Sequence, residues 1–298
     1  MKWRWALLAV LLGAWPHASF CGEDGDPFEG ALHEATLRTF HPTDAVIATD
    51  HGESRIQFLL SLACQVLPME SLDWHVGSYR LSALNFAYDS LYDYHISTRY
   101  SEPVVSRLQN PGFYFSVEAP RSELQAGWFH ESNGQVIDTH AALLAAGPHG
   151  QDFVSRAWDY WYLSSAFRLL EKPTMRFSFV PTLRIFTGAQ GIIHPTEQDI
   201  FWRPSDPPSA IADYDGLRGQ FLGEWLFPHR ICNYLGLSAE FRTGYHEGHF
   251  ASNWSRRFEL TLKTWHIPWY LYYTNGYGPY ISDYSSWSEG YGFGVRIW

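Results

Sequence analysis

Residues 128–133 bring together two side chains that can cleave an ester. Within them His130 and Ser132 stand two positions apart, with Trp128 two positions earlier. On a β-strand, residues two apart share a face, so this spacing would hold an imidazole beside a hydroxyl. A serine hydroxyl becomes an effective nucleophile when a neighbouring histidine removes its proton. The pair could therefore carry out nucleophilic catalysis, although the same residues, in a chain with 14 histidines, could simply end a strand in a polar turn.

Strands are the elements that must position this pair, and the chain predicts many of them. From about residue 53 onward, apolar and polar residues alternate in repeated segments. In one segment Phe58, Leu60 and Leu62 share a face, and Gln57 and Ser61 occupy the other. Period-two alternation is typical of strands rather than helices. The segments run to about ten residues, the length that a tilted strand needs to cross a membrane.

The connections between these segments favour a membrane barrel over a soluble secreted sandwich, which would show the same alternation. Tight turns and long polar loops both occur, as in outer-membrane barrels. A closed barrel also leaves no unpaired strand edge in hydrocarbon. The sequence therefore predicts an all-β fold, a transmembrane antiparallel β-barrel of about 12 strands.

Charged residues on the expected inward face should pair inside this barrel, which argues against an open diffusion pore. They are Arg55, Arg176, Arg184, Glu224, Glu240, Arg242, Glu259 and Lys263. The formal net charge of -10 excludes the basic footprint that a nucleic-acid partner would need. Aromatic residues make up 17% of the chain, which suits the two interfaces of a membrane.

The N-terminal residues predict export. Lys2 and Arg4 precede a short apolar run, and Ala18 and Ser19 then supply small residues for cleavage, so residues 1–21 are expected to form a signal peptide. Residues 22–50 show no alternation and are expected to form an N-terminal periplasmic segment, followed by the barrel over residues 51–298. The chain has three cysteines, which make no closed disulfide framework.

Two motifs resemble those of the outer membrane phospholipase A family. Residues 130–134, His-Glu-Ser-Asn-Gly, are similar to the active-site motif of that family. Residues 155–159, Ser-Arg-Ala-Trp-Asp, are similar to its second motif, Ser-Arg-Ser-Trp-Asn. Residues 57–63 resemble its first strand, and residues 273–284 resemble its penultimate hairpin. The similarity covers nearly the whole mature chain, in order.

The resemblance implies a calcium-dependent phospholipase of the bacterial outer membrane, with its catalytic site at the extracellular end. It would hydrolyse acyl esters of phospholipids in the outer leaflet, and also those of lysophospholipids. Ser132 would be the nucleophile and His130 the general base. Asp159 occupies the position of the family's asparagine, which gives a Ser-His-Asp set. The backbone N–H of Gly134, or that of Asn133, would complete the oxyanion hole.

The resemblance also implies a calcium site shared by a reversible homodimer. Its ligands would be the Ser155 hydroxyl, the Gln135 carbonyl and a carbonyl of the partner chain near Ser101. A polar residue on the second strand helps the family's dimer interface, and the nearest positions here are Asp89 and Ser90.

Two departures from the family keep a second hypothesis open, a catalytically inactive barrel that acts as a channel or an adhesin. Residues 135–154 form a long insertion between two motifs that the family keeps close together. Its length suits an extracellular loop, because such barrels keep their periplasmic turns short. Asp159 in place of asparagine is the second departure.

Overall fold

The computed structural model describes residues 37–38, 40–50, 53–69, 72–95, 104–137, 139–187, 211–227, 231–246, 252–278 and 284–297. Residues 37–298 form one compact unit. The expected signal peptide, Ser101 and residues 22–36 of the expected periplasmic segment lie outside the described residues.

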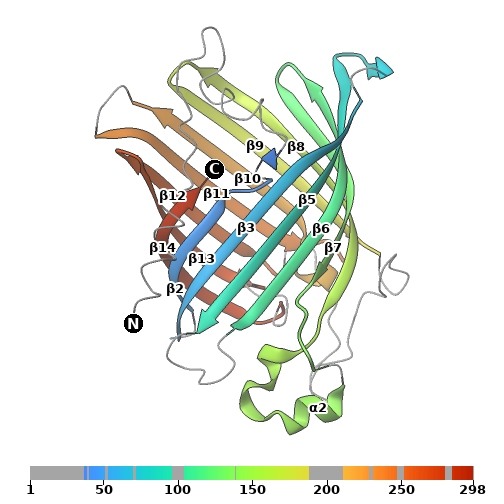
Figure 1. Cartoon of the computed structure of the whole chain (residues 1–298), viewed down its shortest axis with the longest axis vertical. Helices are drawn as coiled ribbons and strands as arrows, with labels where there is room; N and C mark the ends of the chain where they lie inside the picture. The colour runs from blue at the N-terminus through green and yellow to red at the C-terminus, as the bar shows by residue number, and fades with distance from the viewer. Residues whose placement is uncertain are drawn as a thin grey trace. The chain divides into compact units, whose positions relative to one another are not determined.

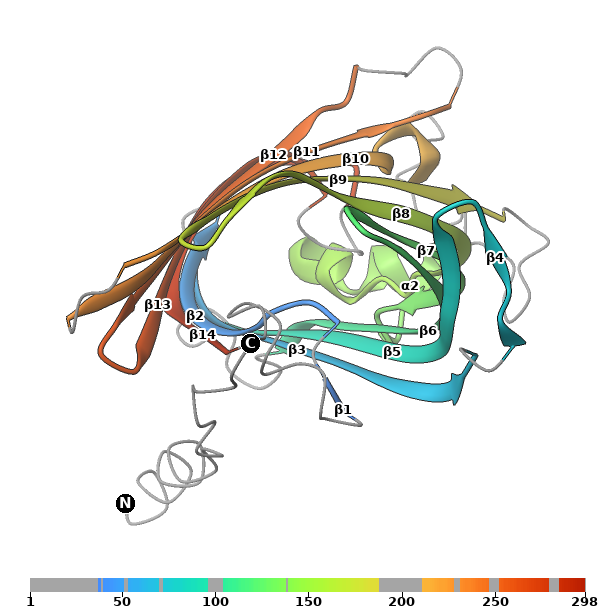
Figure 2. The same cartoon turned by 90° about the horizontal axis from the view of Figure 1, so that it is seen from above.

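In the described part of the chain, twelve long antiparallel strands close a barrel (Figures 1 and 2). They are β2 (Thr43–Asp50), β3 (Glu53–Pro68), β5 (Tyr79–His95), β6 (Val104–Ala119), β7 (Ser122–Ser132), β8 (Ala157–Lys172), β9 (Met175–Phe186), β10 (Gly216–Leu226), β11 (Cys232–Gly244), β12 (Ser255–Thr264), β13 (Ile267–Tyr277) and β14 (Trp287–Ile297). Each strand pairs with its neighbours in this order, and β2 pairs with both β3 and β14, which closes the ring. The predicted all-β barrel of about 12 strands is thus confirmed.

The described residues also form several shorter elements outside the twelve long strands. Two-residue strands, β1 (Leu37–Arg38) and β4 (His75–Val76), extend the pairing of β3 and β5. Helix α2 (His140–Ala145) and the 3-10 helices η2 (Gly147–Phe153) and η4 (Ile211–Asp213) lie in connections between strands. No helix among the described residues is long and apolar enough to cross a membrane.

The barrel begins earlier than the alternation indicated, because β2 lies within the expected N-terminal segment. Apolar residues occupy both faces of this strand, so its period-two pattern is hidden in the sequence. Val46 and Ala48 are buried in the lumen, where they pack with Tyr270 and Tyr272 of β13, and Ile47 faces outward with 65% of its surface exposed. The expected boundary between the N-terminal segment and the barrel at residue 50 therefore lies too late in the sequence, because β2 already pairs with β3 and β14.

The two ends of the barrel differ in the length of their connections. At one end β6–β7, β8–β9 and β12–β13 are joined by two-residue turns at 120–121, 173–174 and 265–266. At the other end residues 133–156, 187–215 and 278–286 join β7–β8, β9–β10 and β13–β14. Long loops mark the extracellular end of outer-membrane barrels. Figure 1 shows α2 beyond that end, past the last residues of β7.

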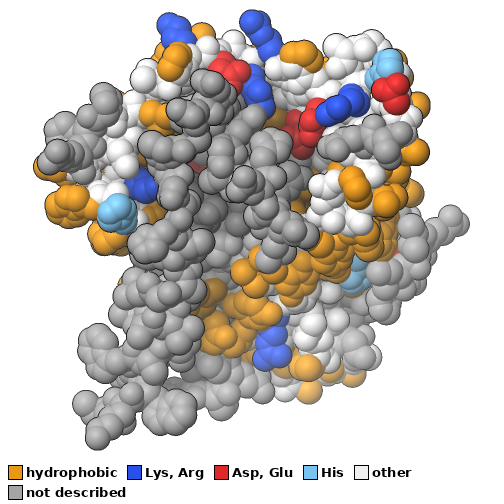
Figure 3. Space-filling model, turned by 45° about the horizontal axis from the view of Figure 1, so that its top comes forward, with side chains coloured by type: hydrophobic (Ala, Val, Ile, Leu, Met, Phe, Trp, Pro, Cys, Tyr) orange, Lys and Arg blue, Asp and Glu red, His pale blue; other side chains and the backbone are white. Residues whose placement is uncertain are grey.

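The outer wall is apolar and the lumen is polar, as the alternation predicts. Figure 3 shows hydrophobic side chains along this wall. Exposed outward residues include Phe58, Leu60, Phe113, Phe115, Trp161, Leu163, Leu169, Ile185, Phe221, Leu237, Phe258, Leu271 and Phe293. On the lumen side of the wall, ion pairs join neighbouring strands, between Arg296 and Asp44 at 2.8 Å and between Arg55 and Asp93 at 3.2 Å. A cavity of about 630 Å³ lies among these groups.

Phe40 and His41, between β1 and β2, turn into the lumen. The Phe40 ring stacks on Phe129 with centroids 5.7 Å apart. His41 Nδ1 lies 2.8 Å from Asp89 Oδ2, and the Ser61 hydroxyl donates to Asp89 Oδ1 at 2.5 Å. The side chain of Asp89 therefore points into the lumen and cannot contact a second chain on the outer wall. Of the two positions expected near a dimer interface, only Ser90 has the outward phase.

Candidate active site

Ser132 is the last residue of β7, and the strand's alternation places it on the outer wall. Phe129 and Glu131 line the lumen cavity. His130 and Ser132 alternate with them along β7 and therefore point outward. Trp128, one step further down the same face, lies directly opposite Trp161 of β8. The sequence-predicted pair is therefore held on a rigid strand and faces the lipid side, as expected.

Asp159 lies directly opposite His130 in the β7–β8 ladder. The His130 Nδ1 atom is 2.8 Å from Asp159 Oδ1, within hydrogen-bond distance. Asp159 is fully buried (0% exposed), and 12% of the His130 side chain is exposed. A carboxylate oxygen accepts, so the Nδ1–H donates to it and Nε2 is left to accept a proton. This is the orientation that a general base beside a serine requires.

Thr187, just beyond β9, fixes the backbone of Asp159. Its N–H and its hydroxyl both donate to the Asp159 carbonyl oxygen, at 3.0 and 3.1 Å. The main chain of Asp159 is therefore held by the end of β9, while its carboxylate contacts His130 of β7. No pattern in the sequence indicates this contact, because it depends on the pairing of β8 with β9.

Gly134, two residues after Ser132, has a left-handed backbone conformation with φ of +56°. Glycine adopts this conformation without the steric strain of other residues. The backbone N–H of Asn133 donates to the Arg156 carbonyl at 3.1 Å, so it is already used within the loop. Of the two N–H groups considered for the oxyanion hole, that of Gly134 is the better candidate.

Asn133 clamps the two ends of the 135–154 insertion together. Its side-chain amide donates to the Val154 carbonyl at 2.7 Å, and its Oδ1 accepts from the Arg156 N–H at 2.9 Å. Further along, the Ser155 N–H donates to the Ile137 carbonyl at 2.8 Å. The insertion thus leaves the barrel and returns beside its own start. The segment that carries Gln135 is bonded to the segment that carries Ser155, although 20 residues separate them in the sequence.

We expect Asn133→Ala to loosen this insertion without unfolding the barrel. The buried Val154 carbonyl and Arg156 N–H would lose their partners, at a cost of about 1–3 kcal/mol. Limited proteolysis should then cut residues 135–154 faster than in the unchanged protein. Asn253→Ala is the matched control, since the Asn253 amide bonds the Asp213 carbonyl at 3.0 Å in a different outer loop. Equal cleavage of the insertion in both variants would contradict the clamp.

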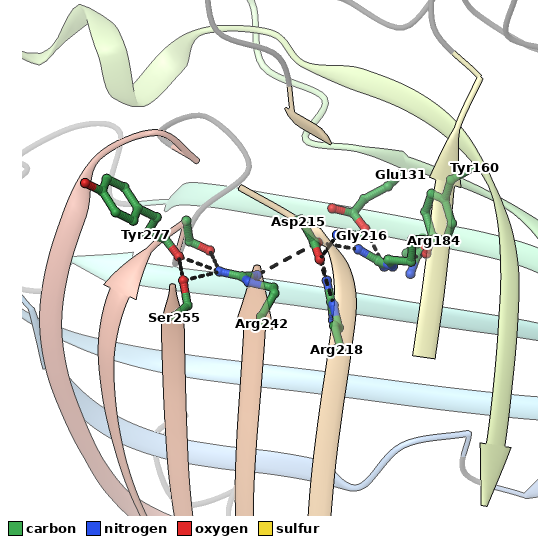
Figure 4. Close-up of polar contacts among 11 residues, drawn as sticks. Glu131, Tyr160, Arg184, Asp215, Gly216, Arg218, Arg242, Ser255 and Tyr277 are labelled. Atoms are coloured by element: carbon green, nitrogen blue, oxygen red, sulfur yellow. Dashed lines mark hydrogen bonds and ion pairs between the residues drawn. The ribbon is translucent and has the colours of Figure 1, made fainter. Parts of the chain in front are cut away.

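A network of ion pairs anchors β7, the strand that carries His130 and Ser132, from the lumen side (Figure 4). Glu131, between His130 and Ser132 in the sequence, pairs with Arg184 of β9 at 2.9 Å. Arg184 also pairs with Asp215 at 3.1 Å, and its guanidinium lies 4.1 Å from the centre of the Tyr160 ring.

Asp215 extends this network to β10 and β11. It pairs with Arg218 and lies 4.0 Å from Arg242. Burial opposes its ionisation, but Arg218, Arg184 and Arg242 together hold the pKa of Asp215 well below its usual range. The carboxylate therefore stays charged. Alternation predicted that Arg184 and Arg242 point inward, but the sequence did not indicate which acidic groups they would meet.

Two of the three expected calcium ligands fall within the described residues, and Ser101 lies outside them. Ser155 and Gln135 are half-buried on the two segments that Asn133 joins. They would offer a hydroxyl and a carbonyl, which are oxygen ligands of the kind that calcium accepts. The described residues hold no cluster of three or more His, Cys, Asp or Glu side chains that could bind a metal. A cation here would thus be held mainly by neutral oxygens.

Comparison with known proteins finds the fold but no close relative. No protein-family model matches the chain, and no curated protein sequence matches it. Outer membrane phospholipase A from Escherichia coli superposes with a TM-score of 0.58 at 16% identity, over 88% of this chain and 94% of that one.

A calcium-bound dimer of the outer membrane phospholipase from Salmonella typhi gives a TM-score of 0.56 at 16% identity, over 89% of this chain and 93% of that one. An active-site mutant of the E. coli protein gives the same TM-score and identity over 89% and 92%. These likenesses confirm, at the level of the fold, the resemblance that the motifs indicated. The chain thus has the fold of outer membrane phospholipase A, a closed barrel of twelve antiparallel strands.

Proposed function

We propose that this barrel is a calcium-dependent phospholipase that hydrolyses the acyl esters of phospholipids and lysophospholipids in the outer leaflet. One observation carries the proposal. The buried carboxylate of Asp159 accepts from the imidazole of His130 on the lipid side of the wall, and Ser132 is next on that face. A buried carboxylate that orients a histidine beside a serine is the arrangement of many unrelated serine hydrolases.

In the proposed reaction, His130 Nε2 removes the proton of the Ser132 hydroxyl as its oxygen attacks the ester carbonyl carbon. Negative charge then develops on the carbonyl oxygen, and the Gly134 N–H would stabilise it. Collapse of this intermediate releases the lysophospholipid, which takes the proton from His130. Water, activated by the same histidine, then hydrolyses the acyl-serine and releases the fatty acid.

Calcium would be held by the Ser155 hydroxyl, the Gln135 carbonyl and a third oxygen near Ser101 of a second copy of the chain. When bound, it would add Lewis-acid stabilisation of charge on the carbonyl oxygen. The clamp at Asn133 supports this ligand set, because it removes the separation that the insertion would otherwise create. The reversible homodimer belongs to the same proposal, and the Salmonella protein is a calcium-bound dimer.

The lumen favours an enzyme over the channel hypothesis. Ion pairs between Arg296 and Asp44, on neighbouring strands, and between Arg184 and Glu131, on β9 and β7, place opposite charges on the lumen wall. Charged groups that neutralise one another and fill a small barrel leave little path for solutes. These paired charges support the proposal that the chemistry takes place on the outer wall, where Ser132 lies.

The test is phospholipid hydrolysis by the refolded protein in detergent micelles, with calcium and then with a chelator. We expect hydrolysis with calcium and a loss of about 100-fold or more on chelation, the size of effect that one oxyanion-stabilising group supplies. Magnesium at the same concentration is the control, because it prefers a rigid octahedral set with several waters. Activity unchanged by the chelator would remove calcium from the proposal. A correctly folded barrel without activity in either condition would favour the non-enzymatic hypothesis.

A further inference from the structure

The lipid-facing wall beside Ser132 carries a polar cluster in an otherwise apolar surface. Gln109 of β6 lies directly opposite Ser132 on one side and Ser90 of β5 on the other. Its amide oxygen accepts from the Tyr88 hydroxyl, and its amide nitrogen donates to the Tyr92 hydroxyl at 3.1 Å. The side chain of Gln109 is thus held in place immediately beside the candidate nucleophile.

Arg107 lies two residues further toward the extracellular end of β6, on the same face as Gln109. Leu108 and Asn110 line the lumen cavity, so the odd-numbered residues of this part of β6 point outward. Arg107 is exposed and pairs in register with Tyr92, and its carbonyl oxygen accepts from the Gln109 amide at 3.2 Å. It forms no ion pair with any residue that the structure describes.

A guanidinium on this wall requires an anionic partner or contact with water. At the middle of a membrane an outward arginine on a barrel costs about 2–4 kcal/mol, and near the interface about 0–1 kcal/mol. Arg107 sits three residues from the start of β6, near the end of the barrel that the long loops assign to the extracellular side, where lipid head groups would lie. Guanidinium groups bind phosphate through two parallel hydrogen bonds, and the head groups of phospholipids carry phosphate at this level.

The separation of Arg107 from Ser132 matches the geometry of a glycerophospholipid. Gln109 is level with Ser132, and two residues of strand rise place Arg107 about 7 Å further outward. In such a lipid the ester carbonyl and the phosphate are joined by the short glycerol backbone, with the phosphate on the head-group side. A lipid with its ester at Ser132 would therefore present its phosphate within reach of the long Arg107 side chain, and its glycerol oxygens beside Gln109.

We infer that Arg107 binds the phosphate of the substrate lipid and so selects phospholipids over neutral acylglycerols. This inference rests on the proposed esterase function of Ser132 and adds a specificity-determining residue to it. Arg107 contributes to substrate binding, and Gln109, fixed by Tyr88 and Tyr92, bridges the space between phosphate and ester.

The experiment compares two substrates with the same short acyl chains, a diacyl phosphatidylcholine and a diacylglycerol, in calcium-containing micelles. We expect Arg107→Gln to lower kcat/KM for the phosphatidylcholine by about 10- to 100-fold, the value of a hydrogen-bonded charge. Hydrolysis of the diacylglycerol, which has no phosphate, should stay unchanged. Arg107→Lys should restore part of the loss. Arg121→Gln, at an exposed arginine in the turn at the opposite end of the barrel, should leave both reactions unchanged.

A binding measurement separates recognition from chemistry. In the Ser132→Ala background, Arg107→Gln should weaken binding of the phosphatidylcholine by a similar factor and leave diacylglycerol binding unchanged. An equal loss for both lipids, or no loss for either, would overturn the role of Arg107.

Failure of the Arg107 role and failure of the proposed esterase give different results. If Arg107→Gln alters only the thermal stability of the barrel in membranes that contain lipopolysaccharide, the guanidinium binds phosphate of a neighbouring lipid, and the inference fails. If the unchanged protein hydrolyses neither ester, the proposed function fails first. If it hydrolyses both, and Arg107→Gln does not discriminate between them, only the inference fails.

Discussion

Replacing Ser132 with alanine is expected to lower phospholipid hydrolysis by at least about 1,000-fold while the barrel still folds. The hydroxyl oxygen of Ser132 is the atom that would form the acyl intermediate, and no other serine shares the outer face of β7 with His130 at this end. The substitution removes a single oxygen from a half-buried strand end. Heat-modifiable migration on a gel would show that the barrel remains intact.

The matched control is Ser122→Ala, on the same strand and the same face but at the periplasmic end. The Ser122 hydroxyl donates to the Tyr79 hydroxyl at 3.2 Å, far from His130 along β7. This variant should keep full activity. In the unchanged protein, a slowly hydrolysed ester should leave its acyl group on Ser132, detectable by mass spectrometry of the peptide. Activity retained by Ser132→Ala would show that the nucleophile lies elsewhere.

Asp159→Ala is expected to lower kcat by about 100- to 10,000-fold, the contribution typical of a positioned acid–base group. The carboxylate of Asp159 keeps the imidazole proton of His130 on Nδ1, and the alanine variant loses this hydrogen bond. The effect should fall on kcat rather than on KM, because Asp159 is buried behind His130. Steady-state kinetics on a short-chain phospholipid would measure both constants.

Asp159→Asn keeps an oxygen acceptor beside His130 but removes the negative charge. The amide can keep an oxygen acceptor at 2.8 Å from Nδ1, since asparagine has nearly the same shape as aspartate. This variant should retain clearly more activity than Asp159→Ala, and asparagine is the residue that the resembling family carries there. If alanine and asparagine were equally inactive, the charge itself would be required. If Asp159→Ala were fully active, Asp159 would have no part in orienting the histidine.

Local patterns predicted the parts of the site that lie within one strand. The two-residue spacing of His130 and Ser132 places both on one face wherever β7 begins or ends. Alternation likewise predicted that Phe58 faces lipid and that Arg184 faces the lumen. These statements need only the strand period, which the sequence displays directly.

Contacts between strands could not be predicted in the same way. The pairing of His130 with Asp159 depends on the register of β8 against β7, which the alternation within either strand does not specify. Asn133 joins the two ends of the connection between these strands through two buried hydrogen bonds. The resemblance of motifs brought Asp159 into the site, since no periodicity within β8 distinguishes it.

β2 and the two residues that turn into the lumen, Phe40 and His41, show a second limit of sequence patterns. β2 carries apolar residues on both faces, because Val46 and Ala48 on its lumen side pack on Tyr270 and Tyr272. Phe40 enters the lumen because the aromatic rings of Phe129 and Tyr114 surround it there. Both features depend on residues far along the chain.

The alternation of β7 also constrains how sequences of this kind can change in length. Glu131 contacts Arg184 in the lumen, while its two neighbours in the chain face lipid. Inserting or deleting one residue within β7 would exchange these environments, turning the histidine and serine inward and a carboxylate toward hydrocarbon. Beyond residue 134 no such penalty applies, because a loop can lengthen at little cost. Length variation among descendants of this chain should therefore accumulate between residues 135 and 154, and the eleven residues of β7 should be inherited as a block of fixed length.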